Sequence, residues 1–344
     1  MAEKSKNGHY GREDVAQRAG VSGATVSYVF SRKRYVSPDL VKRVMRAAEE
    51  LNYQPDMVAA SLRKNSSDTI AVLTDDITSP LQMEIIRAIQ ETAMQNGYFT
   101  HICGGVHRLE SYVDNFISRK VDGVFLSVDP SAVDNSHISR MLERGISVII
   151  TSLRGFSDAR VCGLALDFAA GIRMLVEHLR LLGHKKIAFL SCFDDGFEFD
   201  KRLPAFRDAM REQLGENEPI AITGARPYES TIEKGYELAV RLLQSGQPFT
   251  AVMCTNDLMA LVAMRALREH GLSVPEDVSV AGMDDILFAR SSYPALTTIS
   301  HRAQEYGRRI FDILKQNIDN KSVVLRQKIT PELVVRASTC ACKV

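Results

Sequence analysis

The chain has 344 residues, of which 45% are hydrophobic and 25% charged, and its formal net charge is +1. This composition is typical of a folded globular protein and excludes a largely disordered one, while the length predicts two or three domains. No run approaches the roughly 20 apolar residues that a membrane helix needs, the N-terminus lacks the apolar run of a secretory signal, and six cysteines are too few for a disulfide framework, so we expect a cytoplasmic protein.

The charge is unevenly distributed along the chain. Residues 1–66 hold twelve Lys and Arg against seven Asp and Glu, and this excess of five leaves a balance of −4 for the remaining residues. A basic N-terminal segment on an acidic body indicates a polyanionic partner such as a nucleic acid. An excess of this size also occurs on ordinary solvated surfaces, so the charge needs support from motifs.

The N-terminal segment predicts three short helices. The first spans residues 12–19 and is followed by Gly20, and the second starts after Ser22 as its N-cap and continues to about Phe30. A third helix starts at Ser37 and the proline that follows it. Two short helices joined by a tight glycine-containing turn form the helix-turn-helix pattern.

The second predicted helix has one apolar and one polar face. Val26, Val29 and Phe30 should be buried, and the small and polar residues should face outward. When such a helix lies in the major groove, its N-terminal half reaches base edges and its amides can meet phosphate. A three-helix unit with no ligand is the alternative interpretation. We expect DNA contacts from Ser22, Gly23, Ala24, Thr25, Ser27, Tyr28 and Ser31.

The rest of the chain alternates apolar strands with amphipathic helices, such as those within residues 81–96 and 258–270. This pattern predicts an α/β architecture in two similar halves, in which ligands bind beyond the carboxyl ends of the strands at the crevice between the units. The predicted strands are Thr69–Leu73, Gly97–Cys103, Gly123–Val128 and Ile146–Thr151 in a first series, and Ile187–Ser191, Pro219–Thr223, Ala251–Cys254 and Val278–Ala281 in a second.

Several separated motifs resemble those of one protein family. They are D-V-A-Q-R-A-G-V-S-G-A-T-V-S-Y-V-F at 14–30, V-S-P-D-L at 36–40, E-L-N-Y-Q-P at 50–55, E-H-L-R-L-L-G-H-K-K-I-A at 177–188, T-N-D-L-M-A at 255–260, V-P-E-D-V-S-V-A-G-M-D-D at 274–285 and P-A-L-T-T-I at 294–299. With these motifs in the family's order over nearly its whole length, the chain resembles the lactose/galactose repressor (LacI/GalR) family of bacterial transcriptional regulators.

The resemblance implies a domain organisation. An N-terminal all-α helix-turn-helix domain would occupy residues 1–55, and a hinge helix with its linker residues 56–66. Residues 67–344 would form an α/β two-lobed, periplasmic-binding-protein-like domain for effector binding and dimerisation. Its lobes would comprise residues 67–165 with 295–326 and residues 166–294 with 327–344. Three crossovers would join them, and a strand near Thr297–Ser300 would return the chain to the first lobe.

The resemblance also assigns roles at the DNA. Gly23, Ala24 and Tyr28 occupy positions that usually read major-groove bases in the family, and Tyr28 stands where Arg is most common. We therefore expect an operator that differs from the family's common half-site, with weaker hydrogen-bonded readout. In the hinge, the residue matching Leu62 wedges between base pairs of the minor groove, whereas a plain linker is the alternative. The hinge residues expected at the DNA are Val58, Ala59, Leu62 and Arg63.

The implied effector site lies just beyond the strand ends. Arg202 matches the family arginine that grips the ligand, Asp284 its usual carboxylate partner, and Asn256 the family asparagine. Departures from the family pattern disfavour a simple neutral hexose, although sugars and sugar acids remain candidate effectors. These departures are Gln82 for Phe, Ser152 for Asp and Phe168 for Asn, with extra carboxylates at Glu198 and Asp200. The full set of expected effector contacts is Asp76, Gln82, Ser152, Glu198, Arg202, Asn256 and Asp284.

No motif indicates an enzyme. The chain has no phosphate-binding loop, dinucleotide fingerprint or nucleophile elbow, and its eight histidines lack metal-ligand spacing, so we expect no catalytic residue, cofactor or metal. The resemblance implies a homodimer that binds a near-palindromic operator in double-stranded DNA, responds to a small-molecule effector, has no membrane partner and represses genes of carbohydrate or related metabolism. A corepressor-dependent regulator of nucleotide or other metabolism, and a small-molecule binding protein without a DNA role, are the alternatives.

Overall fold

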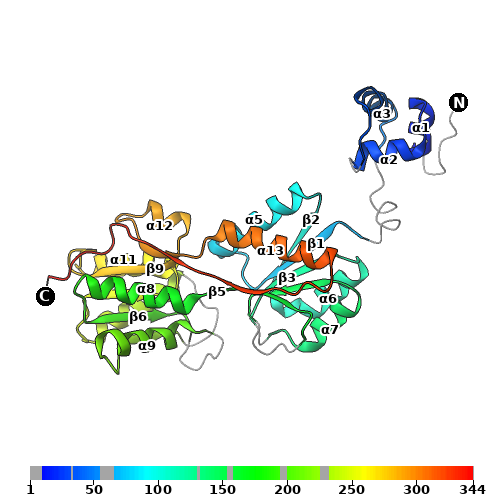
Figure 1. Ribbon diagram of the computed structural model, residues 1–344. Coiled ribbons are helices and arrows are strands. Elements are labelled where there is room, and N and C mark those ends of the chain that lie inside the picture. Colours follow the sequence, from blue (N-terminus) through cyan, green and yellow to red (C-terminus); the bar gives the residue numbers. More distant parts are fainter. Residues whose placement is uncertain are drawn as a thin grey trace. The chain divides into compact units, whose positions relative to one another are not determined.

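The computed structural model describes residues 10–31, 34–54, 66–129, 132–152, 158–193, 200–224 and 232–343. These residues belong to two compact units, which meet in sequence at Ser67 and Asp68 (Figure 1). Within the described ranges, every helix is too short or too polar to span a bilayer.

The first unit consists of three helices, α1 (Arg12–Ala19), α2 (Gly23–Ser31) and α3 (Pro38–Glu50). Gly20 ends α1 in the left-handed conformation at φ 64°, and its N–H donates back to carbonyls of the last helical turn. Val15, Val26 and Val44, one from each helix, are almost fully buried in the shared core. The unit is the helix-turn-helix that the sequence predicts.

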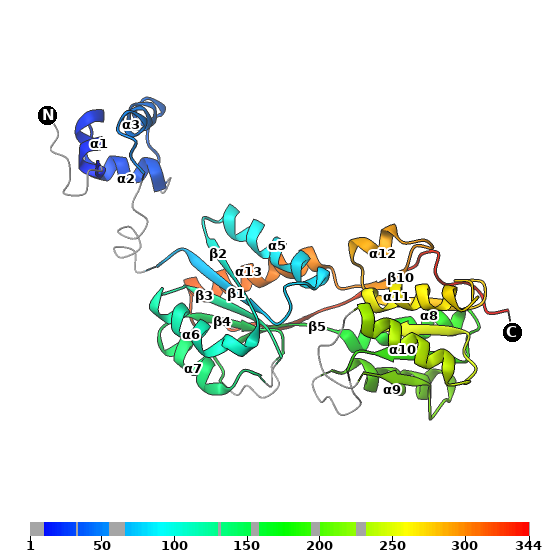
Figure 2. The same cartoon turned by 180° about the vertical axis from the view of Figure 1, so that it is seen from behind.

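The second unit contains two six-stranded sheets, one in each lobe, with helices on both faces of each (Figures 1 and 2). All described pairings are parallel except that β12 runs antiparallel to β10. The first sheet has the order β11-β5-β4-β3-β1-β2, with β1 (Thr69–Thr74), β2 (Phe99–Gly104), β3 (Gly123–Ser127), β4 (Ser147–Ile150), β5 (Cys162–Leu166) and β11 (Arg326–Ile329). The second has the order β12-β10-β9-β8-β6-β7, with β6 (Ile187–Ser191), β7 (Ala221–Thr223), β8 (Ala251–Cys254), β9 (Ser279–Asp284), β10 (Thr297–Ser300) and β12 (Glu332–Val334).

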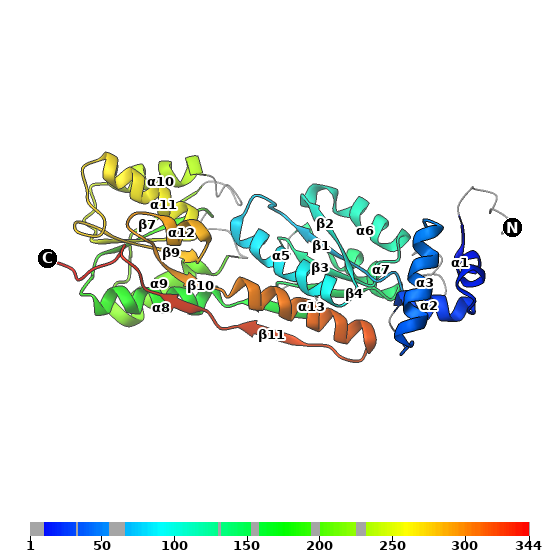
Figure 3. The ribbon, with the colours of Figure 1, turned by 90° about the horizontal axis from the view of Figure 1, so that it is seen from above.

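Alternate residues of each central strand enter different cores, because successive side chains of a strand point to opposite faces. In β1, Ile70 and Val72 pack toward α5 (Pro80–Gln95) and α13 (Ala303–Asp319), which lie side by side (Figure 3). Its other buried side chains pack toward α6 (Leu109–Ser118) and α7 (Asn135–Glu143), and a single 3-10 turn at Val106–Arg108 precedes α6. Both faces of the first sheet are therefore covered, which explains its continuous apolar strands.

The second sheet is covered in the same way. Phe189 and Met253 share a core with α8 (Phe168–Leu181) and α9 (Arg202–Leu214). Leu190 and Val252 face the opposite core, with α10 (Ile232–Gln244) and α11 (Asp257–Glu269). The short helix α12 (Leu287–Ser291) follows β9.

The chain crosses between the lobes after β5, after β10 and after β11. The prediction that the strand at Thr297–Ser300 returns the chain to the first lobe is wrong, because Thr297 and Thr298 pair with β9 of the second sheet. The return follows this strand and leads into α13. The prediction that residues 327–329 belong to the second lobe is also wrong, because β11 pairs with β5 at the edge of the first sheet. The predicted lobe boundaries at 295 and 327 therefore move to about 301 and 330.

Candidate functional site

A cavity of about 870 Å³ opens between the two lobes of the second unit. We call it the cleft. Its walls come from residues at or just beyond the carboxyl ends of β1, β3, β4 and β5 in one lobe, and from residues around α9, α11 and the end of β9 in the other. This is where parallel α/β sheets bind ligands, since the strand ends of both lobes converge there.

Arg202, the first residue of α9, lies in the cleft wall with only 12% of its side chain exposed. Its Nε donates to Asp200 Oδ1 at 2.7 Å, and its Nη1 donates to the carbonyl of Thr255 at 2.9 Å. The guanidinium carbon lies 4.8 Å from the ring centroid of Phe168 and 5.0 Å from that of Phe193. Burial alone would lower the pKa of Arg202, but the Asp200 carboxylate raises it and keeps the guanidinium charged. The arginine is thus held in one orientation before any ligand arrives.

Asp284 ends β9 and lines the cleft in the second lobe. Its φ of 135° is a backbone conformation that few non-glycine residues adopt, and such strain is often found at functional positions. Burial raises the pKa of Asp284 well above its usual range, and the charge of Asp257 raises it further, whereas Arg202 lowers it. The structure therefore brings the predicted Arg202 and Asp284 together in one cleft.

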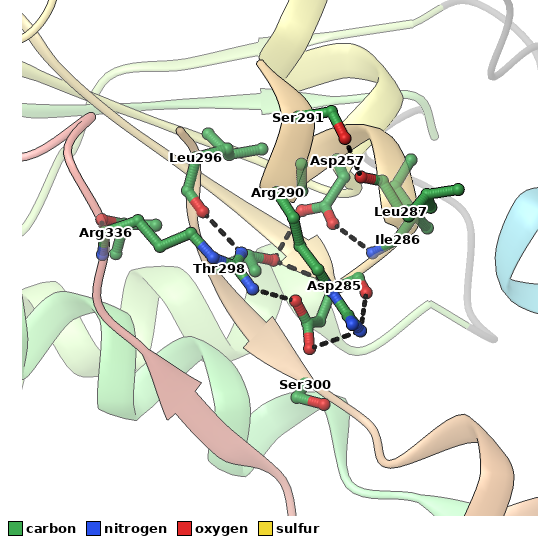
Figure 4. A network of polar contacts seen from close by, with 12 residues as sticks. Asp257, Asp285, Ile286, Leu287, Arg290, Ser291, Leu296, Thr298, Ser300 and Arg336 are labelled. Atoms are coloured by element: carbon green, nitrogen blue, oxygen red, sulfur yellow. Dashed lines mark hydrogen bonds and ion pairs between the residues drawn. The ribbon is translucent and has the colours of Figure 1, made fainter. Parts of the chain in front are cut away.

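Asp257 belongs to a network of polar contacts at the end of β9 (Figure 4). Its carboxylate is fully buried, accepts the hydroxyl of Thr298 at 2.5 Å and accepts the backbone N–H of Ile286 at 2.9 Å. Burial raises the pKa of Asp257 to about 6. The neighbouring Asp285 accepts a hydrogen bond from Arg336, which fastens the segment after β12 to the same region. The network fixes the end of β9, and with it the position of the cleft-lining carboxyl.

Asn256 has two roles, one in a helix and one in the cleft. It is the N-cap of α11, where its Oδ1 accepts the backbone N–H of Met259 at 2.9 Å, and it also lines the cleft. Asn256 therefore caps α11, whereas the Asp257 carboxylate bonds to Thr298 and Ile286.

The first lobe contributes three of the predicted contacts, Asp76, Gln82 and Ser152, all of which line the cleft. Asp76 accepts both the backbone N–H and the hydroxyl of Thr78, at 2.7 and 2.6 Å. Gln82 Oε1 accepts the hydroxyl of Ser127 at 3.0 Å. The predicted contact Glu198 lies outside the described residues.

The sequence prediction missed several cleft residues that the structure reveals. Asp75 and Asp129 follow β1 and β3, and Phe193 follows β6. A search for polar side chains just after the buried strands would have identified the two aspartates, whereas Arg202 and Asp284 were assigned from the family motifs. Phe168 stood out only as a departure from the family pattern, and its stacking on Arg202 needed the fold.

The predicted DNA-contacting residues lie at the start and along one side of α2. Ser22 Oγ accepts the backbone N–H of Thr25 at 3.2 Å, which caps the helix. Ala24 is exposed, and the Arg34 guanidinium lies 5.2 Å from the ring centroid of Tyr28. At Gly23 a Cβ would approach Glu13 Oε1 to 2.6 Å. Thr25 and Ser27 are half-buried, and Ser31 ends the helix.

The four predicted hinge contacts fall outside the described residues. These are Val58, Ala59, Leu62 and Arg63.

A helix-turn-helix unit followed by a two-lobed α/β unit with a ligand-sized cleft defines a ligand-responsive transcriptional regulator. Residues 13–56 match the family described as "Bacterial regulatory proteins, lacI family", and residues 176–339 match "Periplasmic binding protein-like domain". The chain is 32% identical over 334 residues to the HTH-type transcriptional repressor PurR of Haemophilus influenzae (strain PittEE), covering 95% of this chain and 97% of that protein. It is 32% identical over 338 residues to the PurR repressor of Pasteurella multocida (strain Pm70), covering 95% and 97%. The chain belongs to the LacI family.

Solved structures agree with this assignment. The lac repressor dimer bound to operator and the anti-inducer ONPF superposes with a TM-score of 0.81 at 29% identity, covering 97% of this chain and all of that one. A LacI-family regulator from Enterococcus faecium with bound ribose superposes with a TM-score of 0.70 at 26% identity, covering 80% of this chain and all of that one.

Proposed function

We propose that this chain represses transcription as a homodimer on a near-palindromic operator, and that a small molecule bound in the cleft changes its affinity for that operator. The observation that carries the proposal is the prepared cleft between two lobes, in a chain that also holds a helix-turn-helix. Because three crossovers connect the lobes, a ligand that contacts both walls favours one interlobe angle over another. A coupling of about 1–3 kcal/mol would change operator affinity about 5–150-fold.

For DNA recognition, we assign the reading of bases to the exposed side of α2 from its N-terminus to Tyr28. Ala24 is exposed and can contact only a thymine methyl, while Tyr28 offers one hydroxyl and a ring. The guanidinium over the Tyr28 ring adds a positive charge beside this surface. Residues 56–66 would form the hinge, with Leu62 as the minor-groove wedge.

For effector recognition, Arg202 is the best-supported contact, because its charge and orientation are fixed by Asp200, the Thr255 carbonyl and two aromatic rings. Asp284 and Asn256 lie in the wall of the same lobe, and Asp76, Gln82 and Ser152 in the opposite one. A ligand with hydrogen-bonding groups on two sides could therefore bridge the lobes.

The dimer surface that we propose runs along one side of the second unit. Exposed apolar side chains gather on α5, β2 and around α12, which lie along the same side of the unit in Figures 1 and 2. Phe99, on the edge strand β2, is 80% exposed, and Tyr293, just after α12, is 90% exposed. Apolar patches of this kind typically mark protein interfaces. The other members are Met94, Ile102, Leu287 and Phe288.

Operator selection followed by effector titration tests the function. Duplexes enriched by the full-length chain from a randomised pool should share a near-palindromic site, and operator affinity should change when candidate metabolites are added. A ligand that lowers affinity identifies an inducer, whereas one that raises it identifies a corepressor, the second mode that this fold supports. We place this activity in the cytoplasm and assign no catalytic step to the cleft. Turnover of a bound metabolite would contradict that assignment.

A further inference from the structure

Three residues that line the cleft carry buried polar atoms without a hydrogen-bond partner in the described part of the chain. Thr74 Oγ1 and Asp75 Oδ1 in the first lobe, and Asp200 Oδ2 in the second, are buried without a hydrogen-bond partner among the described residues. Thr74 is fully buried and Asp200 is 8% exposed. Buried polar atoms are nearly always paired in folded proteins, so those that line a binding cleft indicate groups that a ligand supplies. Because ionised carboxylate oxygens can only accept hydrogen bonds, a ligand that pairs with Asp75 and Asp200 must offer hydrogen-bond donors, and the Thr74 hydroxyl can accept from such a donor as well.

Among these residues, Asp75 has the strongest need for a positively charged partner. It follows β1 directly, and its Oδ2 accepts the backbone N–H of Asp129 at 2.6 Å, whereas Oδ1 has no partner among the described residues. No lysine or arginine of the described residues forms an ion pair with it. Burial, together with the smaller effect of the charges of Asp129 and Asp76, raises the pKa of Asp75 to about 6, although the hydrogen bond from the Asp129 N–H lowers it. A hydroxyl donor would satisfy Oδ1 but leave this accumulated negative charge in place.

Three of the basic residues that line the cleft already contact groups other than Asp75. Arg202 pairs with Asp200, Arg326 donates to the carbonyls of Val161 and Asp158, and Lys328 Nζ lies 3.6 Å from the carboxylate of Asp167. Among the described residues, the cleft wall carries six aspartates against four basic side chains, so aspartates outnumber basic groups even without Asp284, whose pKa is raised. The charge of Glu84, on α5 of the first lobe, also raises the pKa of Asp284 in the second. Negative charge on both lobes opposes closure unless a cation lies between them.

We infer that the effector carries a protonated amine that docks against Asp75 at the end of β1, while the rest of the molecule reaches Arg202 and Asp284 on the other lobe. The inference rests on the proposed function and deepens it, because it assigns the effector to amine-bearing small molecules. An ammonium group donates up to three hydrogen bonds, so it can satisfy both Asp75 Oδ1 and the neighbouring Thr74 Oγ1. It also supplies the positive charge that the first lobe lacks at this point.

Matched probes that differ in charge test the inference on the full-length chain. Glucosamine would be compared with glucose and gluconate, and putrescine with butane-1,4-diol, by thermal shift and isothermal titration calorimetry. We expect an amine to bind at least about tenfold more tightly than its uncharged analogue, because a charge-assisted hydrogen bond is lost in the analogue. Asp75→Asn should remove that preference, whereas Asp312→Asn, the same change at an exposed position of α13, should keep it.

A pH profile separates a direct contact from a structural effect. The affinity of the wild-type chain for putrescine, whose amines stay protonated over this range, should rise between about pH 5 and pH 8 as the Asp75 carboxyl ionises, with Asp76 and Asp129 as the charged groups facing it. Asp75→Asn should flatten this rise. If Asp75→Asn fails to melt cooperatively, Asp75→Ser serves as the second variant, since serine keeps an acceptor but removes the charge.

Three results would overturn the inference. One is equal or tighter binding of the neutral or anionic analogues, another is the absence of any shift with the amines, and the third is an equal response to Mg²⁺ or Ca²⁺ alone. Operator binding without probe distinguishes this failure from failure of the proposed function. Loss of amine preference with intact operator binding overturns only the effector class, whereas absent operator binding in the wild-type chain overturns the function.

Discussion

Replacement of Arg202 by methionine tests whether this arginine neutralises the buried Asp200 carboxylate and is held in place before a ligand binds. The variant removes the guanidinium but keeps a long apolar side chain between Phe168 and Phe193. It leaves the Asp200 carboxylate, whose side chain is only 6% exposed, without the cation that now donates to its Oδ1 at 2.7 Å. Breaking a buried ion pair by removing one partner costs about 3–5 kcal/mol.

We therefore expect Arg202→Met to lower the free energy of unfolding of the second unit by about 3–5 kcal/mol. Each kcal/mol lost should lower the melting temperature by about 2–4 °C. Urea denaturation followed by circular dichroism measures the change. The double variant Asp200→Asn with Arg202→Met removes both charges and should recover about half or more of the loss, because the uncompensated carboxylate is the main cost. A single variant within about 1 kcal/mol of wild type, or a double variant that recovers nothing, would refute the reasoning.

Three further predictions follow from individual contacts. Gly282→Ala places a Cβ 2.3 Å from Asp257 Oδ1 and 2.9 Å from Leu296 Cδ2, so urea denaturation should show a loss of about 1–3 kcal/mol, and an unchanged midpoint would contradict this crowding. The pKa of Asp75 is about 6 in the folded protein and about 4 in the unfolded chain, so the free energy of unfolding should fall as pH rises from about 4 through 6. Asp75→Asn removes this titration, and its free energy of unfolding at pH 8 should exceed that of the wild type by up to about 3 kcal/mol. An equal difference between the two proteins at pH 4 and pH 8 would exclude this origin. Phe99→Glu buries a charge in the proposed dimer surface and should weaken self-association by about tenfold or more in analytical ultracentrifugation, while an unchanged dimer would place the interface elsewhere.

Much of the fold could be predicted because it is encoded in local patterns. The first helix occupies residues 12–19 as predicted, and the strands at 187–191 and 251–254 coincide with uninterrupted apolar runs. Such runs are informative because helices cover both faces of each sheet, which requires apolar side chains on either side of the strand.

Strand partners could not be predicted in the same way. β11, with the sequence Arg-Gln-Lys-Ile, is mostly exposed at a sheet edge, so nothing in its composition marks it as a strand. The placement of β10 depends on the pairing of Thr298 with Gly282 and on its hydrogen bond to Asp257, contacts between residues far apart in the chain. Crossover positions are therefore set by tertiary pairing, which periodicity does not record.

Part of the candidate site could be predicted from the sequence. Motif positions identified Arg202, Asp284 and Asn256, all of which line one cleft. They could not show that Phe168 and Phe193 flank the arginine, nor that the Asp75 carboxylate is buried against the strand end of β3. Burial of a charge depends on what packs around it in three dimensions. The burial of the Asp75 carboxylate, on which the proposed amine contact depends, could therefore not be predicted from the sequence.

The central claim is that the first unit brings this chain to a specific DNA sequence. The most direct measurement is fluorescence anisotropy of the full-length chain with duplexes recovered from a randomised pool, repeated over a range of salt concentrations. The account predicts a near-palindromic consensus, and a logarithm of affinity that falls linearly with the logarithm of salt by about 0.9 for each phosphate contacted. No enriched sequence, or an affinity that is indifferent to salt, would contradict it.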